Sequence, residues 1–169
     1  MNKNLRKILV GAILAALVCV VTFSVRVPIP MTQGAYVNLG DSVVYLGSFF
    51  NCNIVTAFAL GLGSALADIL AGAAIYAIPT FLVKTAMALI AMLIFKKSKT
   101  IKGYLLGSVA AGLVMVAGYF ICESVMFGVA TAAASIVGNL IQLAGGVVIS
   151  APVWYALKKF ALTERAKIS

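Results

Sequence analysis

Histidine is absent from this chain of 169 residues, and Asp and Glu together number only four. Zinc and other transition-metal sites depend mainly on His and Cys, and hydrolytic centres need a nucleophile beside a base or a cluster of carboxylates. We therefore expect no metal site and no cofactor. An enzyme embedded in the membrane is a weak interpretation of this chain.

Cysteine is also rare. Cys19, Cys52 and Cys122 are odd in number, widely spaced and embedded in apolar sequence, and no Cys-x-x-Cys pair occurs. This pattern does not indicate a disulfide framework. We expect the three thiols to be small hydrophobic side chains within the fold.

Charged residues make up 10% of the chain, hydrophobic residues make up 63%, and the mean hydropathy is +1.13. These values lie far from those of soluble domains and indicate an integral membrane protein. The net charge of +9 does not favour nucleic-acid binding, because the basic residues stand at the ends of apolar segments instead of gathering on one surface.

Eleven of the thirteen Lys and Arg residues fall in three clusters between long apolar segments. The clusters are Lys3, Arg6 and Lys7; Lys96, Lys97, Lys99 and Lys102; and Lys158, Lys159, Arg165 and Lys167. Lys and Arg near the ends of transmembrane helices stay on the cytoplasmic side. The pattern predicts a multi-pass membrane protein with cytoplasmic N and C termini.

A transmembrane helix needs about 20 apolar residues, and an even number of crossings must separate successive clusters. The sequence therefore predicts an all-α bundle of six transmembrane helices in a single domain, residues 1–169. The expected helices are residues 8–25, 39–50, 53–73, 76–95, 103–127 and 132–157. The first is taken as a helix and not as a cleaved signal peptide, because further spans follow it and no clear cleavage site ends it. The second is short and is expected to be tilted, broken or extended.

The external segment between the first two helices, residues 26–38, differs from the other connections. Pro28, Pro30 and Gly34 disfavour helix and allow an ordered loop or a short extended piece. Such a segment is long enough to fold back over a cavity. A simple surface connector is the alternative.

Ionisable residues inside a bilayer are costly and mark functional sites by default. The apolar segments contain Asp41, Asp68, Lys84 and Glu123. Lys84 lies about 12 Å inward from Tyr76 at helical rise, so it needs a buried partner or a ligand. Asp68 and Glu123 are the expected partners, and an ion pair that only holds the bundle together is the alternative.

Amide and aromatic side chains are expected at the same depth. Asn139 and Gln142 are three residues apart and share a helix face. Lysine, carboxylate, amide and tyrosine groups around one cavity suit a small planar polar ligand. The candidate binding residues are Tyr36, Asn38, Tyr76, Lys84, Tyr119, Glu123, Asn139 and Gln142. Trp154 and Tyr155, just before Lys158, are expected to be anchors at the inner membrane interface.

Small residues mark the first helix. Ala12 and Ala16 are four residues apart, and Gly11 and Ala15 form a second such pair beside them. Small-xxx-small pairs let another helix approach closely. The partner could be a second subunit, and internal packing is the alternative for such residues.

These features together resemble the S components of energy-coupling factor (ECF) transporters. The segment GAYVNLGD (residues 34–41) looks like the loop and second helix of the riboflavin-transporter-like branch, and NLIQ (residues 139–142) resembles the same branch. The likeness covers nearly the whole chain. It implies a subunit of a prokaryotic plasma membrane that captures a vitamin outside the cell and delivers it inward with a transmembrane coupling subunit and two ATPase subunits. It also assigns contact with the coupling subunit to Ala12 and Ala16.

The residues at the expected site favour a single heteroaromatic ring, such as hydroxymethylpyrimidine or a vitamin B6 form. Folate and cobalamin are disfavoured because the outer loops are short, and riboflavin stays open on the resemblance. A different class of function also stays open. A stand-alone secondary transporter or channel could use the intramembrane pair of Lys84 and a carboxylate.

Overall fold

The computed structural model describes residues 2–29 and 36–168, and it describes side chains as far as residue 160. The elements in chain order are α1 (Lys3–Ser24), β1 (Arg26–Pro28), β2 (Tyr36–Asn38), α2 (Gly40–Phe50), α3 (Ile54–Leu70), the 3₁₀ helix η1 (Ala74–Tyr76), α4 (Ala77–Lys97), α5 (Ile101–Phe127) and α6 (Val129–Ile168). Six α-helices are present in this part of the chain, as the apolar pattern predicts. The four central helices agree with the predicted ranges to within three residues, whereas α1 begins earlier and α6 ends later.

Polar caps and glycines determine several of the helix ends. The side chains of Asn2, Asn53 and Thr100 accept hydrogen bonds from backbone N–H groups in the first turns of α1, α3 and α5, at 3.1–3.2 Å. Gly72, two residues after the end of α3, and Gly128, the residue after α5, have φ angles of +78° and +88°. Glycine adopts this conformation without steric cost, so the chain can reverse direction there.

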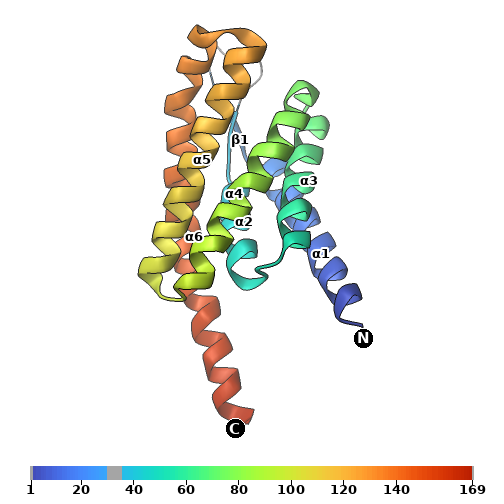
Figure 1. The fold of residues 1–169 in the computed structure, drawn as a ribbon, viewed down its shortest axis with the longest axis vertical. Helices are drawn as coiled ribbons and strands as arrows, with labels where there is room; N and C mark the ends of the chain where they lie inside the picture. The colour runs from blue at the N-terminus through green and yellow to red at the C-terminus, as the bar shows by residue number, and fades with distance from the viewer. Residues whose placement is uncertain (1, 30–35, 169) are drawn as a thin grey trace.

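The long helices form an open ring, and α2 stands inside it (Figure 1). Packing runs from α1 to α3, then to α4, α5 and α6, while α2 contacts α1, α3, α4 and α6. Nine of the eleven residues of α2 are buried. The helix therefore fills the centre of the bundle and bridges the gap between α1 and α6.

The six predicted helices are all present, and α2 is as short as the sequence indicates. At 1.5 Å per residue its eleven residues extend about 16 Å, against about 30 Å for the hydrocarbon core. In the described part of the chain, four helical segments are long and apolar enough to cross a membrane: Lys3–Ser24, Ala74–Lys97, Ile101–Phe127 and Val129–Phe160. The apolar helix α3 is shorter. A short helix is tolerated at this depth because protein surrounds it on nearly every side.

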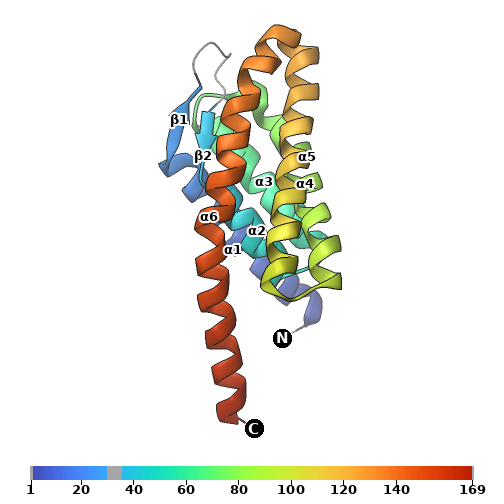
Figure 2. The ribbon, with the colours of Figure 1, turned by 90° about the vertical axis from the view of Figure 1, so that its left-hand side faces the viewer.

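The segment between α1 and α2 forms an antiparallel pair of strands, in which Arg26 pairs with Asn38 and Pro28 with Tyr36. The prediction of a short extended piece is confirmed, and the fold is not purely helical. In Figure 2 the strands lie beside the half of α6 that is farther from the C-terminus. Strand β2 runs directly into α2. Residues 30–35 lie outside the described structure.

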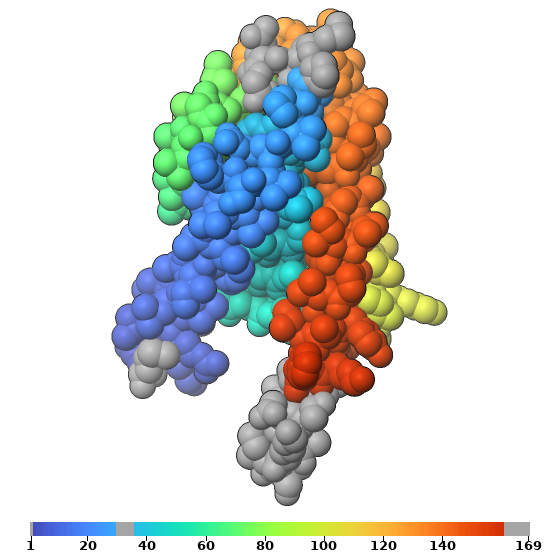
Figure 3. Space-filling model, turned by 180° about the vertical axis from the view of Figure 1, so that it is seen from behind, coloured from blue at the N-terminus to red at the C-terminus, as the bar shows by residue number. Residues whose placement is uncertain are grey.

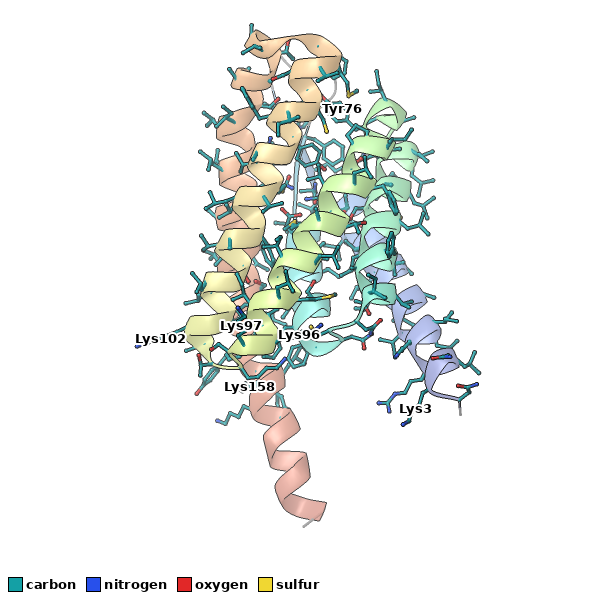
Figure 4. All side chains as sticks on the ribbon, in the orientation of Figure 1. Lys3, Tyr76, Lys96, Lys97, Lys102 and Lys158 are labelled. Atoms are coloured by element: carbon teal, nitrogen blue, oxygen red, sulfur yellow. The ribbon has the colours of Figure 1, made fainter. Side chains whose placement is uncertain are left out.

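Both termini lie at the same end of the molecule (Figure 1). Lys3, Lys96, Lys97, Lys102 and Lys158 gather there too, whereas Tyr76 lies at the opposite end (Figure 4). We call these the basic end and the outer end. The three basic clusters of the sequence thus meet at one end of the fold, as the predicted topology requires.

Aromatic rings fill the interior near the basic end. Phe49, Phe95, Tyr104 and Trp154 pack with ring centroids 5.1–5.7 Å apart. Trp154 is 1% exposed, so its prediction as an interfacial anchor is wrong, because its ring packs into this cluster. Tyr155, its neighbour, is 63% exposed.

The small residues of α1 occupy two different faces. Gly11 is buried, with Val55 and Ala59 of α3 beside it, and Ala15 meets Gly63 of α3. This assigns Gly11 and Ala15 to packing within the chain and corrects their grouping with a partner surface. Ala12 and Ala16 are exposed. Adjacent residues lie about 100° apart around a helix, which separates the two pairs.

Candidate functional site

A polar cavity lies among the strands and helices of the outer half of the bundle. It is lined by Tyr36, Asn38, Asp68, Tyr76, Thr80, Tyr119, Glu123, Asn139 and Gln142. Seven of the eight residues proposed from the sequence are among them. Lys84 is not, and Asp68 and Thr80 line the cavity without having been proposed as binding residues.

Six elements bring these side chains together. Tyr36 and Asn38 come from β2, Asp68 from α3, Tyr76 and Thr80 from η1 and α4, Tyr119 and Glu123 from α5, and Asn139 and Gln142 from α6. The α5 pair is four residues apart and the α6 pair three, so each pair shares one helix face. Thr80 could have been found by the same rule, because it lies four residues from both Tyr76 and Lys84.

The cavity is nearly filled by its own side chains. Its volume is about 30 Å³, while all the space between atoms in the same region, including the open mouth, amounts to about 340 Å³. A cavity of the smaller size holds one or two water molecules. A ring-sized ligand therefore requires the lining side chains to separate.

Three polar atoms in this lining are buried and have no well-aligned hydrogen-bond partner among the described residues: Asp68 Oδ2, the Tyr76 hydroxyl and Glu123 Oε2. The Tyr76 hydroxyl lies near the Glu123 carboxyl and Thr80 lies near Asp68, but neither neighbour satisfies these three atoms. A buried polar group without a partner costs about 1–3 kcal/mol, and more when it is charged. Their shared position on one cavity indicates that water or a ligand supplies the missing bonds.

A hydrogen-bond chain anchors β2 to α6 beneath the cavity. The backbone N–H of Asn38 donates to Gln142 Oε1 at 2.9 Å, and Gln142 Nε2 donates to Asp41 Oδ2 at 3.0 Å. The Asn38 side chain accepts from the N–H of Gly40 at 2.8 Å. These bonds use most of the capacity of Asn38 and Gln142, so both side chains are held in position by the protein itself.

Lys84 lies in this network and not in the cavity lining. Its ammonium group forms an ion pair with Asp41 and lies 3.1 Å from Met115 Sδ. Both charged side chains are almost completely buried. The predicted partners, Asp68 and Glu123, are therefore wrong, because α2 enters the centre of the bundle and places Asp41 opposite Lys84.

Two tyrosines of the lining are fixed by hydrogen bonds. The Tyr36 hydroxyl donates to Asp68 Oδ1, and the Tyr119 hydroxyl lies 2.9 Å from Thr80 Oγ1. Burial raises the pKa of the Tyr36 phenol, and the neighbouring Asp68 carboxyl raises it further. Tyr36 therefore stays neutral, and it joins the strand pair to α3.

The site has the chemistry of a binding pocket. Among the described residues no group of three or more His, Cys, Asp and Glu side chains could hold a metal ion. The lining offers carboxyl oxygens as acceptors, tyrosine rings as flat apolar surfaces, and amides as mixed donors and acceptors. Such a set has the chemistry to bind a small aromatic molecule with polar substituents.

Comparison with known proteins agrees with this description. The model of the family of ECF-type riboflavin transporter S components matches residues 2–159. The chain belongs to this family. As an S component it is a multi-pass protein of the prokaryotic cell membrane that takes part in the transport of vitamins or their precursors.

Two curated relatives cover most of this S component. An uncharacterized protein from a gap 3′ region of Pyrococcus woesei is 37% identical over 142 residues, which are 84% of this chain and 95% of the relative. The thiamine precursor transporter HmpT of Lactococcus lactis is 30% identical over 149 residues, which are 88% of this chain and 86% of the relative.

Proposed function

We propose that this S component captures a small heteroaromatic vitamin or precursor on the outer side of the membrane and delivers it inward with an ATP-driven module. The observation that carries the proposal is the set of three buried, unpartnered polar atoms on the cavity, those of Asp68, Tyr76 and Glu123. A soluble ligand with polar edges supplies what these atoms lack.

Hydroxymethylpyrimidine fits this set best. The two carboxyl oxygens accept hydrogen bonds from an amino and a hydroxyl group, and the Tyr76 hydroxyl can donate to a ring nitrogen. The rings of Tyr36 and Tyr119 supply flat faces on which a pyrimidine can pack. The similarity to a thiamine precursor transporter supports the same class. A vitamin B6 form is the second choice.

The absence of a cation from the described lining favours an uncharged or amino-bearing ligand. Lys84 is paired with Asp41 and lies outside the lining. A phosphate ester placed beside Asp68 and Glu123 would be desolvated with no countercharge. This S component should therefore reject phosphorylated forms of its substrate.

The size of the cavity favours a single ring over riboflavin. With a volume of about 30 Å³, the pocket must already expand for a pyrimidine, and a three-ring flavin would require much larger movements. Strand β2 forms one wall of the pocket: among the described residues it packs on β1, α1 and α6, and its Tyr36 side chain reaches Asp68 of α3. Separation of β2 from α3 would break the Tyr36–Asp68 hydrogen bond.

We infer the orientation from the charges. The basic end carries the three basic clusters, so by the positive-inside rule it faces the cytoplasm. The cavity then opens toward the outside, where a scarce vitamin is captured. Family membership implies association with a transmembrane coupling subunit and ATPase subunits. The exposed Ala12 and Ala16 are the proposed contact with the coupling subunit.

Calorimetry on the purified chain in detergent, without ATPase subunits, tests this function. The ligands are hydroxymethylpyrimidine, pyridoxine, riboflavin, thiamin, pantothenate and folate. Tight binding of hydroxymethylpyrimidine or pyridoxine supports the proposal. Binding of none, together with uptake by the chain alone in vesicles, would instead establish a stand-alone transporter.

A matched pair of variants separates capture from coupling. Glu123→Gln should weaken ligand binding and leave assembly with the ATPase module unchanged. Ala16→Trp should leave binding unchanged and abolish ATP-driven uptake. Full uptake by Ala16→Trp would show that the module docks elsewhere.

A further inference from the structure

A second, larger groove opens between α1 and α6 at the basic end, away from the polar cavity. Figure 3 shows it as the hollow between the lower parts of these two helices, with α2 at its floor. Its volume is about 1010 Å³, at the upper end of the range of about 300–1,000 Å³ for small-molecule sites. Vitamin capture at the outer end does not use it.

Three cations stand at the mouth of this groove. Lys3, Arg6 and Lys7 line it, and their spacing of three and four residues places them on one face of α1. All three are exposed, and none forms an ion pair with a described carboxylate. The described lining contains no acidic residue. The mouth therefore carries uncompensated positive charge.

The walls behind these cations are apolar. They are formed by Val10, Leu14, Leu17, Val43, Leu46, Phe50, Val153 and Leu157. Gly47, Asn51, Cys52 and Asn53, in α2 and directly after it, complete the lining, and the two asparagines are its only uncharged polar side chains among the described residues. Along α1 the lining extends from Lys7 to Leu17, about 15 Å at helical rise. This is half of the roughly 30 Å hydrocarbon core, or the depth of one leaflet.

We propose that the groove binds one anionic phospholipid of the leaflet at the basic end. Its phosphate lies among Lys3, Arg6 and Lys7, and an acyl chain lies along the walls toward the middle of the bilayer. Basic pockets between transmembrane helices are known to bind anionic headgroups. The long Lys and Arg stems let the charges reach the headgroup level while their carbon atoms pack on the chain.

The groove is distinct from the proposed surface for the coupling subunit. Ala12 and Ala16 are exposed and do not line it. Leu14 and Leu17 lie on another face of the same helix. The two roles of α1 can therefore be altered one at a time.

Lipid titration of the intact chain in neutral detergent tests the proposal. The probes are phosphatidylglycerol and phosphatidylcholine with the same acyl chains, and the readouts are lipid retained per chain by native mass spectrometry and the shift in Tm. The charge variant is Lys3→Gln, Arg6→Gln and Lys7→Gln together. Its matched control is Lys96→Gln, Lys97→Gln and Lys102→Gln, which removes equal charge from the same end outside the groove.

The wild type should retain phosphatidylglycerol about tenfold or more in preference to phosphatidylcholine. The charge variant should lose this preference and the control should keep it. Equal binding of the two lipids, or equal loss in both variants, would overturn the proposal, since the attraction would then be general surface charge.

A second pair of variants tests the apolar walls. Leu17 lines the groove and is 48% exposed, whereas Ile13 is 66% exposed and lies outside the lining. Leu17→Trp should reduce retention of phosphatidylglycerol, and Ile13→Trp should not. If Leu17→Trp retained the lipid and instead lost assembly with the ATPase module, the groove would belong to a protein partner.

Discussion

The outer and inner halves of the bundle interior are built differently. The outer half is a polar cavity, and the inner half is a cluster of packed rings around Phe49 and Trp154. In the described part of the chain, buried polar atoms without a hydrogen-bond partner occur in both halves. Those of the inner half include the Tyr104 hydroxyl and the Trp154 indole N–H, attached to rings that pack tightly. Those of the outer half include two carboxyl oxygens on an open cavity.

The polar cavity suits the outer half to ligand binding, and the packed rings make the inner half rigid. An unpaired carboxyl is far more costly to bury than an unpaired hydroxyl, so under the proposed function a ligand stabilises the outer half and not the inner half. The Lys84–Asp41 ion pair lies between the halves and joins α4 to α2. Variants in the three zones should therefore change stability and affinity in different proportions.

The largest loss of stability is expected from Lys84→Met. It leaves Asp41 buried without its cation, at a cost of about 3–5 kcal/mol. Unfolding in a denaturing detergent series measures the loss. Adding Asp41→Leu to the same chain should recover much of it. A single variant as stable as the wild type would show that the pair does not hold α2 in place.

The next largest loss is expected from Trp154→Ala, at about 3 kcal/mol, because it empties space in the ring cluster. Ligand affinity of the folded fraction should stay within about twofold, since the cavity lies in the other half. Calorimetry and thermal unfolding on the same sample measure both quantities. A large loss of affinity would mean that the two halves are coupled.

How far the sequence alone could predict this fold depends on the element. The helices α1 and α4 to α6 follow from apolar runs of spanning length, because the bilayer sets that length. The central position of α2 could not be predicted in this way, since eleven residues are too few to span and only tertiary packing shows that the helix is enclosed. The location of Trp154 was predicted wrongly for the same reason, because a Trp shortly before Lys158 can lie either at the membrane interface or in the protein core.

The site was easier to predict than the partners of its residues. Counting depth along each helix brings Glu123, Asn139 and the tyrosines to one level, and the cavity gathers them. The same counting did not find the partner of Lys84, because it gives the depth of a residue in the membrane and not the side of the helix on which the residue lies. Asp41 lies at the start of α2, which follows β2 directly, and it faces Lys84 from the centre of the bundle.

Within the outer half, Glu123→Gln should have the largest effect on affinity. Replacing a carboxylate acceptor by an amide weakens a charge-assisted hydrogen bond by about 1.5–3 kcal/mol, or roughly 10–100-fold in Kd. The free energy of unfolding should not fall, because a buried carboxyl is removed. Calorimetry on the wild type and the variant compares them. Unchanged affinity would remove Glu123 from the binding surface.

The smallest effect is expected from Tyr36→Phe. It removes the hydrogen bond to Asp68 and keeps the ring, so affinity should fall about 2–10-fold. Tyr155→Phe is the matched control, because Tyr155 is exposed and lies outside the lining. Equal effects of both variants on Kd would show that the strand pair does not contribute to binding.

The most direct test is calorimetric titration of the purified chain with hydroxymethylpyrimidine and, separately, with its phosphate ester. The described lining holds two carboxyl groups and no cation, so we predict tight binding of the unphosphorylated compound and at least about a hundredfold weaker binding of the ester. Preference for the ester would mean that Lys84 is available to the ligand, and it would contradict both the ion pair and the proposed pocket.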